Sequence, residues 1–328
     1  MTRVILPFSS AHLDAAAELL AKRHETQLLR EPRLPRRFTS AAETKLLLEA
    51  LLPRSEGVVA VEDDRVVGYL LSSPDSGWGG RARLVPMEGH AVGHSDAVEV
   101  YRELYAAASP AWNDAGFFQH AINLPAGDEA ASAAFVSLGF GQMLAFGLRD
   151  LAPLEGVSKT VRIERAGEAH LEDVRRLMVG LGQYNSQSPL YRPFVPQTDT
   201  EWARGPAVLK QMVEENCAYW LAYDGDRAVG VMIFTPPDPT ELMVSPEDAV
   251  YLWIAYVQPD ARISGAGKAL VDNGLAWARS RGLGHCTVGW FTTNITGARF
   301  WTGRGYAPVM HRLERRIDER IAWAKAAG

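Results

Sequence analysis

Residues 251–270 have the sequence YLWIAYVQPDARISGAGKAL. The apolar and aromatic run at 251–257 is typical of a buried strand, and Pro259 ends it. A glycine-bearing turn follows, and the apolar spacing beyond it predicts a helix that stops at Gly282. The stretch therefore predicts a strand, a tight turn and the start of a helix.

The turn has the features of an anion-binding site. The first N–H groups of a helix lack partners within the helix, and the helix dipole adds partial positive charge there. Gly265 and Gly267 let the backbone approach a ligand closely, and Arg262 and Lys268 add formal charge. A P-loop is excluded, because Ala269 stands where that motif needs Ser or Thr. A diphosphate suits this turn, although a turn that only tightens a strand-to-helix joint explains the same residues.

The same order of features occurs twice along the chain. Residues 59–71 and 221–233 each alternate apolar residues around an acidic turn, which predicts a β-hairpin. A helical pattern opens after His12 and another after His170, and each half closes on a helix-stopping glycine followed by an aromatic residue. The repeated order favours a duplicated domain over chance recurrence.

Composition narrows the class of protein. The chain has 328 residues, of which 47% are hydrophobic and 22% charged, values typical of globular proteins. The net charge of −5 argues against a nucleic-acid or membrane partner. Cys217 and Cys286 lack metal-ligand spacing, and His90 and His94 lack a third ligand, so no metal site is expected. Without an apolar run of signal-peptide or membrane-spanning length, a cytoplasmic protein is expected.

The turn also carries a family signature. Arg262-x-x-Gly265-x-Gly267 matches the Gln/Arg-x-x-Gly-x-Gly/Ala motif of the Gcn5-related N-acetyltransferases, the GNAT superfamily, which the chain therefore resembles. Further family positions follow in order up to residue 306: Asn294, the pair Phe300-Trp301 and the pair Gly305-Tyr306. The two-domain layout is similar to that of mycothiol synthase.

The resemblance implies a tandem fold of class α/β (α+β), in which each domain has a mixed, mostly antiparallel sheet flanked by helices. The break in periodicity near 150–159 divides the chain into a domain at 1–152 and a catalytic domain at 160–328. The first domain has no counterpart of the motif and has Asp128 where Asn294 would align, so we expect it to have lost the cofactor.

By the same resemblance, the cofactor is acetyl-coenzyme A (acetyl-CoA). Val257 would pair with the pantetheine arm, and Asn294 would contact the cofactor from the next strand end. A gap is implied between the strands at 251–257 and 286–291. The residues expected to hold the pyrophosphate are Arg262, Ile263, Ser264, Gly265, Ala266, Gly267 and Lys268.

Two positions depart from the family pattern. Tyr251 stands where the family commonly has a glutamate base, and Trp301 stands where it has a tyrosine acid. An indole N–H donates a hydrogen bond but does not give up its proton, so Trp301 can only donate to sulfur or pack. The candidate bases are Glu247, Asp248 and Tyr251 at this strand and His311 on the last expected strand, and for each a purely structural role explains the residue as well.

The expected function is acetyl transfer from acetyl-CoA to a primary amine of a small molecule, by a monomer or homodimer. Two alternatives keep the fold. The altered acid and base positions fit a non-catalytic acyl-CoA sensor, and the acceptor could instead be a protein N-terminus or lysine.

Overall fold

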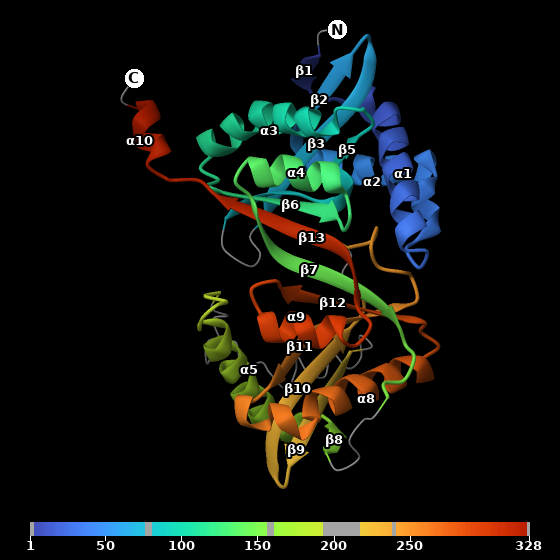
Figure 1. The fold of residues 1–328 in the computed structure, drawn as a ribbon, viewed down its shortest axis with the longest axis vertical. Coiled ribbons are helices and arrows are strands. Elements are labelled where there is room, and N and C mark those ends of the chain that lie inside the picture. Colours follow the sequence, from blue (N-terminus) through green and yellow to red (C-terminus); the bar gives the residue numbers. More distant parts are fainter. Residues whose placement is uncertain (1–2, 76–80, 156–160, 193–216, 238–240, 327–328) are drawn as a thin grey trace. The chain divides into compact units, whose positions relative to one another are not determined.

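The computed structural model describes residues 3–75, 81–155, 161–192, 217–237 and 241–326, which form two compact units (Figure 1). The first unit consists of Met1–Ala145 with Pro308–Gly328, and the second of Phe146–Ala307. The chain leaves the first unit within β7 (Gly141–Asp150) and returns to it in β13 (Ala307–Arg316). The C-terminal strand is therefore grouped with the N-terminal residues, a feature that the sequential division at 152–160 does not include.

The first unit is a mixed sheet with helices. Its strands follow the order β1-β2-β3-β4-β6-β13, with β5 beside β3; β4 and β6 are parallel, whereas β6 and β13 are antiparallel. The strands not yet given are β1 (Val4–Pro7), β2 (Glu56–Glu62), β3 (Arg65–Asp75), β4 (Ala82–Val85), β5 (His90–Val92) and β6 (Gln119–Pro125). The α-helices are α1 (Leu13–Arg30), α2 (Ala41–Leu51), α3 (Ala97–Asp114), α4 (Glu129–Ser137) and α10 (Ile321–Ala326), and the 3₁₀ turns are η1 (Ser10–His12), η2 (Arg36–Thr39), η3 (Leu52–Arg54) and η4 (Met87–Gly89).

The second unit repeats this plan. Its strands follow the order β12-β11-β10-β9-β8; β11 and β12 are parallel, and the ladders from β11 to β8 are antiparallel. The strands are β8 (Arg162–Arg165), β9 (Ala218–Asp224), β10 (Arg227–Thr235), β11 (Ala249–Val257) and β12 (His285–Phe291). The helices are α5 (Leu171–Asn185), α8 (Ala266–Ser280) and α9 (Ile295–Thr302), with 3₁₀ turns η5 (Glu168–His170) and η6 (Pro259–Ser264). The expected mixed, mostly antiparallel sheets flanked by helices are confirmed.

The same kinds of turn and helix-start hydrogen bond occur at corresponding places in the two units. Both expected hairpins form: Asp63 and Asp64 turn β2 into β3 with positive φ, and Gly225 does so between β9 and β10. At the first helix of each unit, a histidine Nδ1 accepts a backbone N–H three residues upstream, at 3.0 Å for both His12 and His170. Such shared detail is expected of a duplicated domain.

The last helices of the units begin alike. Asp128 Oδ1 accepts the N–H of Ala131 at 3.0 Å at the start of α4, and Asn294 Oδ1 accepts the N–H of Gly297 at 2.9 Å at the start of α9. The residue that the sequence aligned with Asn294 therefore has the same capping role.

Two helices cover opposite faces of the second sheet. Alternating strand residues point to opposite faces. Val231 and Ile233 of β10 pack with Leu177 of α5 in one buried cluster, whereas Gly274 of α8 approaches Phe234 on the other face. The small residue lets α8 lie close to the sheet, and the helix ends as expected at Gly282, whose φ is 77°. Helix α8 is thus held firmly behind the glycine-bearing turn.

The first unit has its own core. Tyr101, Tyr105 and Trp112 of α3 pack with Phe135 of α4 against the sheet, where Ile122 is fully buried.

Within the described ranges, no helix is long and apolar enough to cross a membrane.

The packing of α8 predicts the sign of one substitution. Alanine at position 274 would place its Cβ 2.1 Å from Phe234 Cζ. Helix propensity alone favours Gly274→Ala by about 1 kcal/mol, but overpacking of a buried site costs about 1–3 kcal/mol. We expect a lower free energy of unfolding, measured by urea denaturation.

The matched control is Gly167→Ala, because a Cβ there meets no atom closer than 4.0 Å. We expect it to change the unfolding free energy by less than about 0.5 kcal/mol. A Gly274→Ala protein more stable than the wild type would show that α8 is not packed this closely.

Candidate functional site

The pairing between β11 and β12 in the second unit ends partway along the strands. The parallel ladder joins Ala249 to His285 at one end and Leu252 to Val288 at the other, and then stops. Beyond Leu252, the β11 residues up to Val257 have no β12 partner in the ladder. The gap that the family resemblance implied is therefore present.

A β-bulge lies at the start of this gap. On the other side of β11, Ile233 pairs with Ile254 and Phe234 pairs with Leu252, so Trp253 is an extra residue. A bulge leaves backbone groups outside the regular ladder and re-aims the strand, which is common beside binding sites. The Trp253 side chain is 40% exposed. The regular β10–β11 pairing is thus interrupted where the β11–β12 pairing ends.

The glycine turn follows directly at the end of β11. Gly265 has φ 86°, a left-handed conformation that favours glycine, and it precedes the first turn of α8. A Cβ at position 267 would lie 3.1 Å from the Phe300 ring and 3.6 Å from Val257 Cγ2. Gly265 is needed for its left-handed backbone, and Gly267 is needed for its close contacts. The N-terminus of α8 therefore lies between the end of β11 and α9.

The turn forms one wall of a cavity of about 530 Å³. The cavity contains seven of the nine residues expected to bind the cofactor, while Ser264 and Ala266 lie in the turn behind its wall. The lining is Leu181, Tyr184, Met232, Ala255, Tyr256, Val257, Arg262, Ile263, Gly265, Gly267, Lys268, Asn294, Thr296, Gly297, Arg299, Phe300, Trp301 and Arg304.

The charge of this lining is one-sided. It includes Arg262, Lys268, Arg299 and Arg304, and no aspartate or glutamate. In the described part of the chain, none of these four side chains forms an ion pair with a carboxylate. Positive charge beside a helix N-terminus attracts anions. The cavity therefore suits a ligand with several negative charges.

A chain of contacts joins the family positions across the cavity. Arg262 Nε donates to Val257 O at 3.2 Å, and its guanidinium lies 4.2 Å from the centre of the Tyr184 ring. The Tyr184 hydroxyl donates to Asn294 Oδ1 at 3.3 Å. Tyr184, which the sequence analysis missed, thus connects the turn to the start of α9.

The catalytic candidates lie in different places. Trp301 is buried in the cavity wall, with its ring 4.8 Å from the Phe300 ring centre. Tyr251 lies in the paired part of β11 and packs 5.7 Å from Phe146.

Glu247 and Asp248 precede β11, at the end of the strand away from the turn. At about 3.3 Å per residue they are on the order of 30 Å from Val257. Asp248 Oδ1 accepts a bond from His285 Nδ1 at 2.7 Å. Among the candidates only Trp301 lines the cavity, and the catalytic roles stay predictions.

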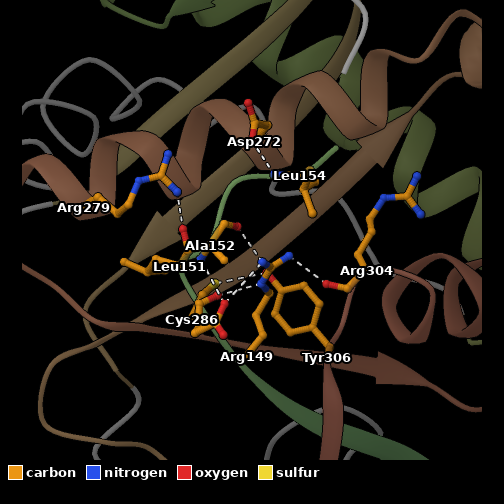
Figure 2. A network of polar contacts seen from close by, with 10 residues as sticks. Arg149, Leu151, Ala152, Leu154, Asp272, Arg279, Cys286, Arg304 and Tyr306 are labelled. Carbon is orange, nitrogen blue, oxygen red and sulfur yellow. Dashed lines mark hydrogen bonds and ion pairs between the residues drawn. The ribbon is translucent and has the colours of Figure 1, made fainter. Parts of the chain in front are cut away.

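A polar network fastens the segment after β7 to this site (Figure 2). Three backbone carbonyls accept hydrogen bonds from Arg149: those of Arg304, Ala152 and Asp150, at 2.6–2.7 Å. The guanidinium also lies over the Tyr306 ring, at 5.7 Å. Arg149 therefore fixes the backbone at the end of α9, where Arg304 enters the cavity wall.

The same network reaches α8. Arg279 donates to Leu151 O, and Leu154 N–H donates to Asp272 Oδ1 at 2.9 Å. The buried Cys286 Sγ accepts from the Tyr306 hydroxyl, and burial raises the pKa of its thiol to about 12. A thiol protonated at neutral pH is a structural group rather than a nucleophile.

The corresponding place in the first unit has a smaller cavity, of about 290 Å³. Its charged lining is mixed: Asp128 and Glu129 face Lys22, Arg23 and Arg30, and Arg30 reaches across to donate to Gly127 O. A Cβ at Gly93 would lie 2.5 Å from Leu19 Cδ2, so α1 closely approaches the counterpart turn. Carboxylates and a crowded turn make this cavity less suited to a phosphate group than that of the second unit.

Comparisons with known proteins agree with this geometry. The model of the acetyltransferase (GNAT) family matches residues 184–306. A GCN5-related N-acetyltransferase from Sphaerobacter thermophilus is similar in structure, with a TM-score of 0.60 and 14% identity over 96% of this chain and 95% of that one.

Two further solved structures share the fold. A tandem GNAT protein from the clavulanic acid biosynthesis pathway has a TM-score of 0.50 and 15% identity over 96% of this chain and 98% of that one. A GCN5-related glucosamine N-acetyltransferase region of a fungal multi-domain GH3 β-N-acetylglucosaminidase has a TM-score of 0.54 and 14% identity, covering 95% of this chain and 38% of that one.

A comparison of the sequence with curated proteins finds no match. The matched segment contains the turn, the end of the β11–β12 ladder and every cavity residue except Leu181, and the structural likeness extends over nearly the whole chain. Residues 184–306 thus match the acetyltransferase (GNAT) family, and the fold of nearly the whole chain is shared with solved GNAT structures that include a tandem GNAT protein.

Proposed function

We propose that the second unit binds acetyl-CoA and transfers its acetyl group to a primary amine of a small molecule. The observation that carries the proposal is the acid-free cavity at Gly265, next to the point where β11 parts from β12. A cationic wall suits the phosphates, and an unpaired strand edge suits a chain of amides.

Each part of the site has a role in this proposal. The turn from Ile263 to Lys268 holds the diphosphate, with Arg262 kept in place by Val257 O and the Tyr184 ring. The free edge of β11 provides N–H and C=O groups to an extended pantetheine arm. Asn294 is positioned by the Tyr184 hydroxyl and by its own helix cap.

When bound, acetyl-CoA supplies the acetyl group as a thioester. The amine must arrive neutral. Its nitrogen bonds to the carbonyl carbon, the carbon–sulfur bond breaks, and the proton lost from nitrogen passes to the departing thiolate or to water. A backbone N–H near the Trp253 bulge is suited to stabilise the charge on the carbonyl oxygen. Because thiols titrate at about 8–9, the thiolate can leave without a strong acid, which tolerates Trp301 in place of a tyrosine.

Two neighbours support an amine acceptor. Both are described as GCN5-related N-acetyltransferases, and one is described as acting on glucosamine, a small molecule with a primary amine. We extend the proposal to a cytoplasmic monomer or homodimer that needs neither nucleic acid nor a membrane.

Calorimetric titration of acetyl-CoA tests the donor site. We expect one site per chain, since the counterpart cavity in the first unit is smaller, has carboxylates among its charged groups and is crowded by Leu19 at Gly93. The double substitution Gly265→Asp with Gly267→Asp should weaken binding at least a hundredfold, because carboxylates there repel phosphates and displace the Phe300 ring.

The control is Ala97→Asp, which puts one negative charge at the start of α3 in the first unit. We expect unchanged affinity and stoichiometry. Two equivalent sites, or affinity that survives the glycine substitutions, would contradict the proposal. A thiol-release assay with glucosamine, polyamines and lysine peptides follows: release with none of them would favour a sensor, and release with peptides alone would favour a protein acetyltransferase.

Substitution of Trp301 tests how the thiolate leaves. Loss of a general acid lowers turnover by about 10²–10⁴-fold. Since an indole gives up no proton, we expect Trp301→Phe to lower kcat by less than about tenfold. Trp301→Ala should lower the unfolding free energy by about 3–5 kcal/mol, because the ring is 6% exposed.

Thiol release measured at pH 7 to 9 gives the kcat values, and urea denaturation gives the stabilities. A loss in Trp301→Phe as large as that of a missing acid would show that the indole N–H takes part in the reaction.

A further inference from the structure

Arg304 is an unusual arginine. Its guanidinium lies 3.4 Å from the centre of the Phe300 ring, and its Nη1 donates to Phe300 O at 2.9 Å. The Nε atom is buried without a partner, and burial lowers the pKa of the group. In the described part of the chain no carboxylate neutralises it. A half-buried cation of this kind is costly unless an anion joins it.

The hydrogen bond from Arg304 to Phe300 O, which caps the end of α9, explains only part of the burial of this arginine. An arginine at a helix C-terminus needs one N–H for a carbonyl and stays well solvated elsewhere. Arg304 instead lies in the cavity wall with donors to spare, and its backbone is held by Arg149. Arg299, from α9, adds a second charge to the wall that pairs with no carboxylate among the described residues.

The location of this charge follows from Phe300. A Cβ at Gly267 would be 3.1 Å from the Phe300 ring, so the ring lies against the turn that precedes α8. Arg304 stacks on that same ring. Through the Phe300 ring, the arginine therefore lies on the side of the cavity formed by the turn at Gly267.

The charges exceed what a diphosphate needs. The turn offers helix N–H groups, and Lys268 stands in the first turn of α8. Arg299 and Arg304 remain for a further anionic group. Coenzyme A has one, a phosphate on the 3′ position of its ribose, and planar guanidinium groups match phosphate geometry with paired hydrogen bonds.

We infer that Arg304, assisted by Arg299, binds the 3′-phosphate of the donor and makes the site selective for coenzyme A over 3′-dephospho-coenzyme A. The inference rests on the proposed donor site and adds a specificity-determining residue to it.

The test compares the dissociation constants of coenzyme A and 3′-dephospho-coenzyme A by calorimetric titration. We expect the wild type to prefer coenzyme A by about tenfold to a hundredfold. Arg304→Gln should reduce this ratio to below about threefold, chiefly by weakening coenzyme A, and Arg299→Gln should reduce it partly. Arg304→Lys, which keeps a point charge without the planar fork, should give an intermediate ratio.

A ratio of two ligands in one variant is insensitive to partial unfolding, so it separates recognition from loss of the helix cap. The matched control is Arg281→Gln, at the other end of α8 from the turn, which should leave the ratio unchanged.

Equal binding of both ligands by the wild type would overturn the inference and leave the donor site standing. An equal loss of both ligands in Arg304→Gln would also overturn it. If neither ligand binds the wild type, the proposed function itself fails.

Discussion

The separation of β11 from β12 is the constraint from which the rest of the second unit follows. Four residue pairs hold the strands together, and past Leu252 and Val288 each has an edge without that neighbour. Backbone N–H and C=O groups removed from water need partners, so an open edge inside a domain is stable only if a ligand or solvent fills it. The bulge at Trp253 starts the opening, and α8 and α9 border it.

Charge is organised around the same opening. Arg262 is held by Val257 and Tyr184, and Arg304 by Phe300, so two of the four cations are oriented before any ligand arrives. Orienting charged groups in advance lowers the entropy lost on binding. In the first unit the matching helix begins with Asp128 and Glu129, and Arg30 bonds to Gly127 O. The two units thus share a fold but differ in the charged groups at the start of the corresponding helix.

Local order was predictable from the sequence, because hairpins, caps and glycine turns depend on near neighbours. The turns at Asp64 and Gly225 and the stop at Gly282 have the expected form, and the strand-turn-helix at 251–270 led to the cavity. Contacts between distant residues were not predictable. Tyr184 lies 110 positions from Asn294, and Arg304, although inside the quoted motif region, shows its role only when stacked on Phe300. The general base could not be predicted for the same reason, because the position of a residue in a strand does not show which distant side chains surround it.

The double crossing of the chain between units has a consequence for how the halves could be separated. A polypeptide starting at residue 160 would lack Arg149 and the carbonyls of Asp150 and Ala152 that bind it. It would also keep β13, whose antiparallel partner β6 would be left on the other piece. Cutting the chain at its apparent linker therefore yields two incomplete halves, each missing an edge of its sheet. Although the fold is duplicated, neither copy is encoded completely by the sequence on one side of the linker. A gene for either half alone would have to supply the missing edge strand in another way.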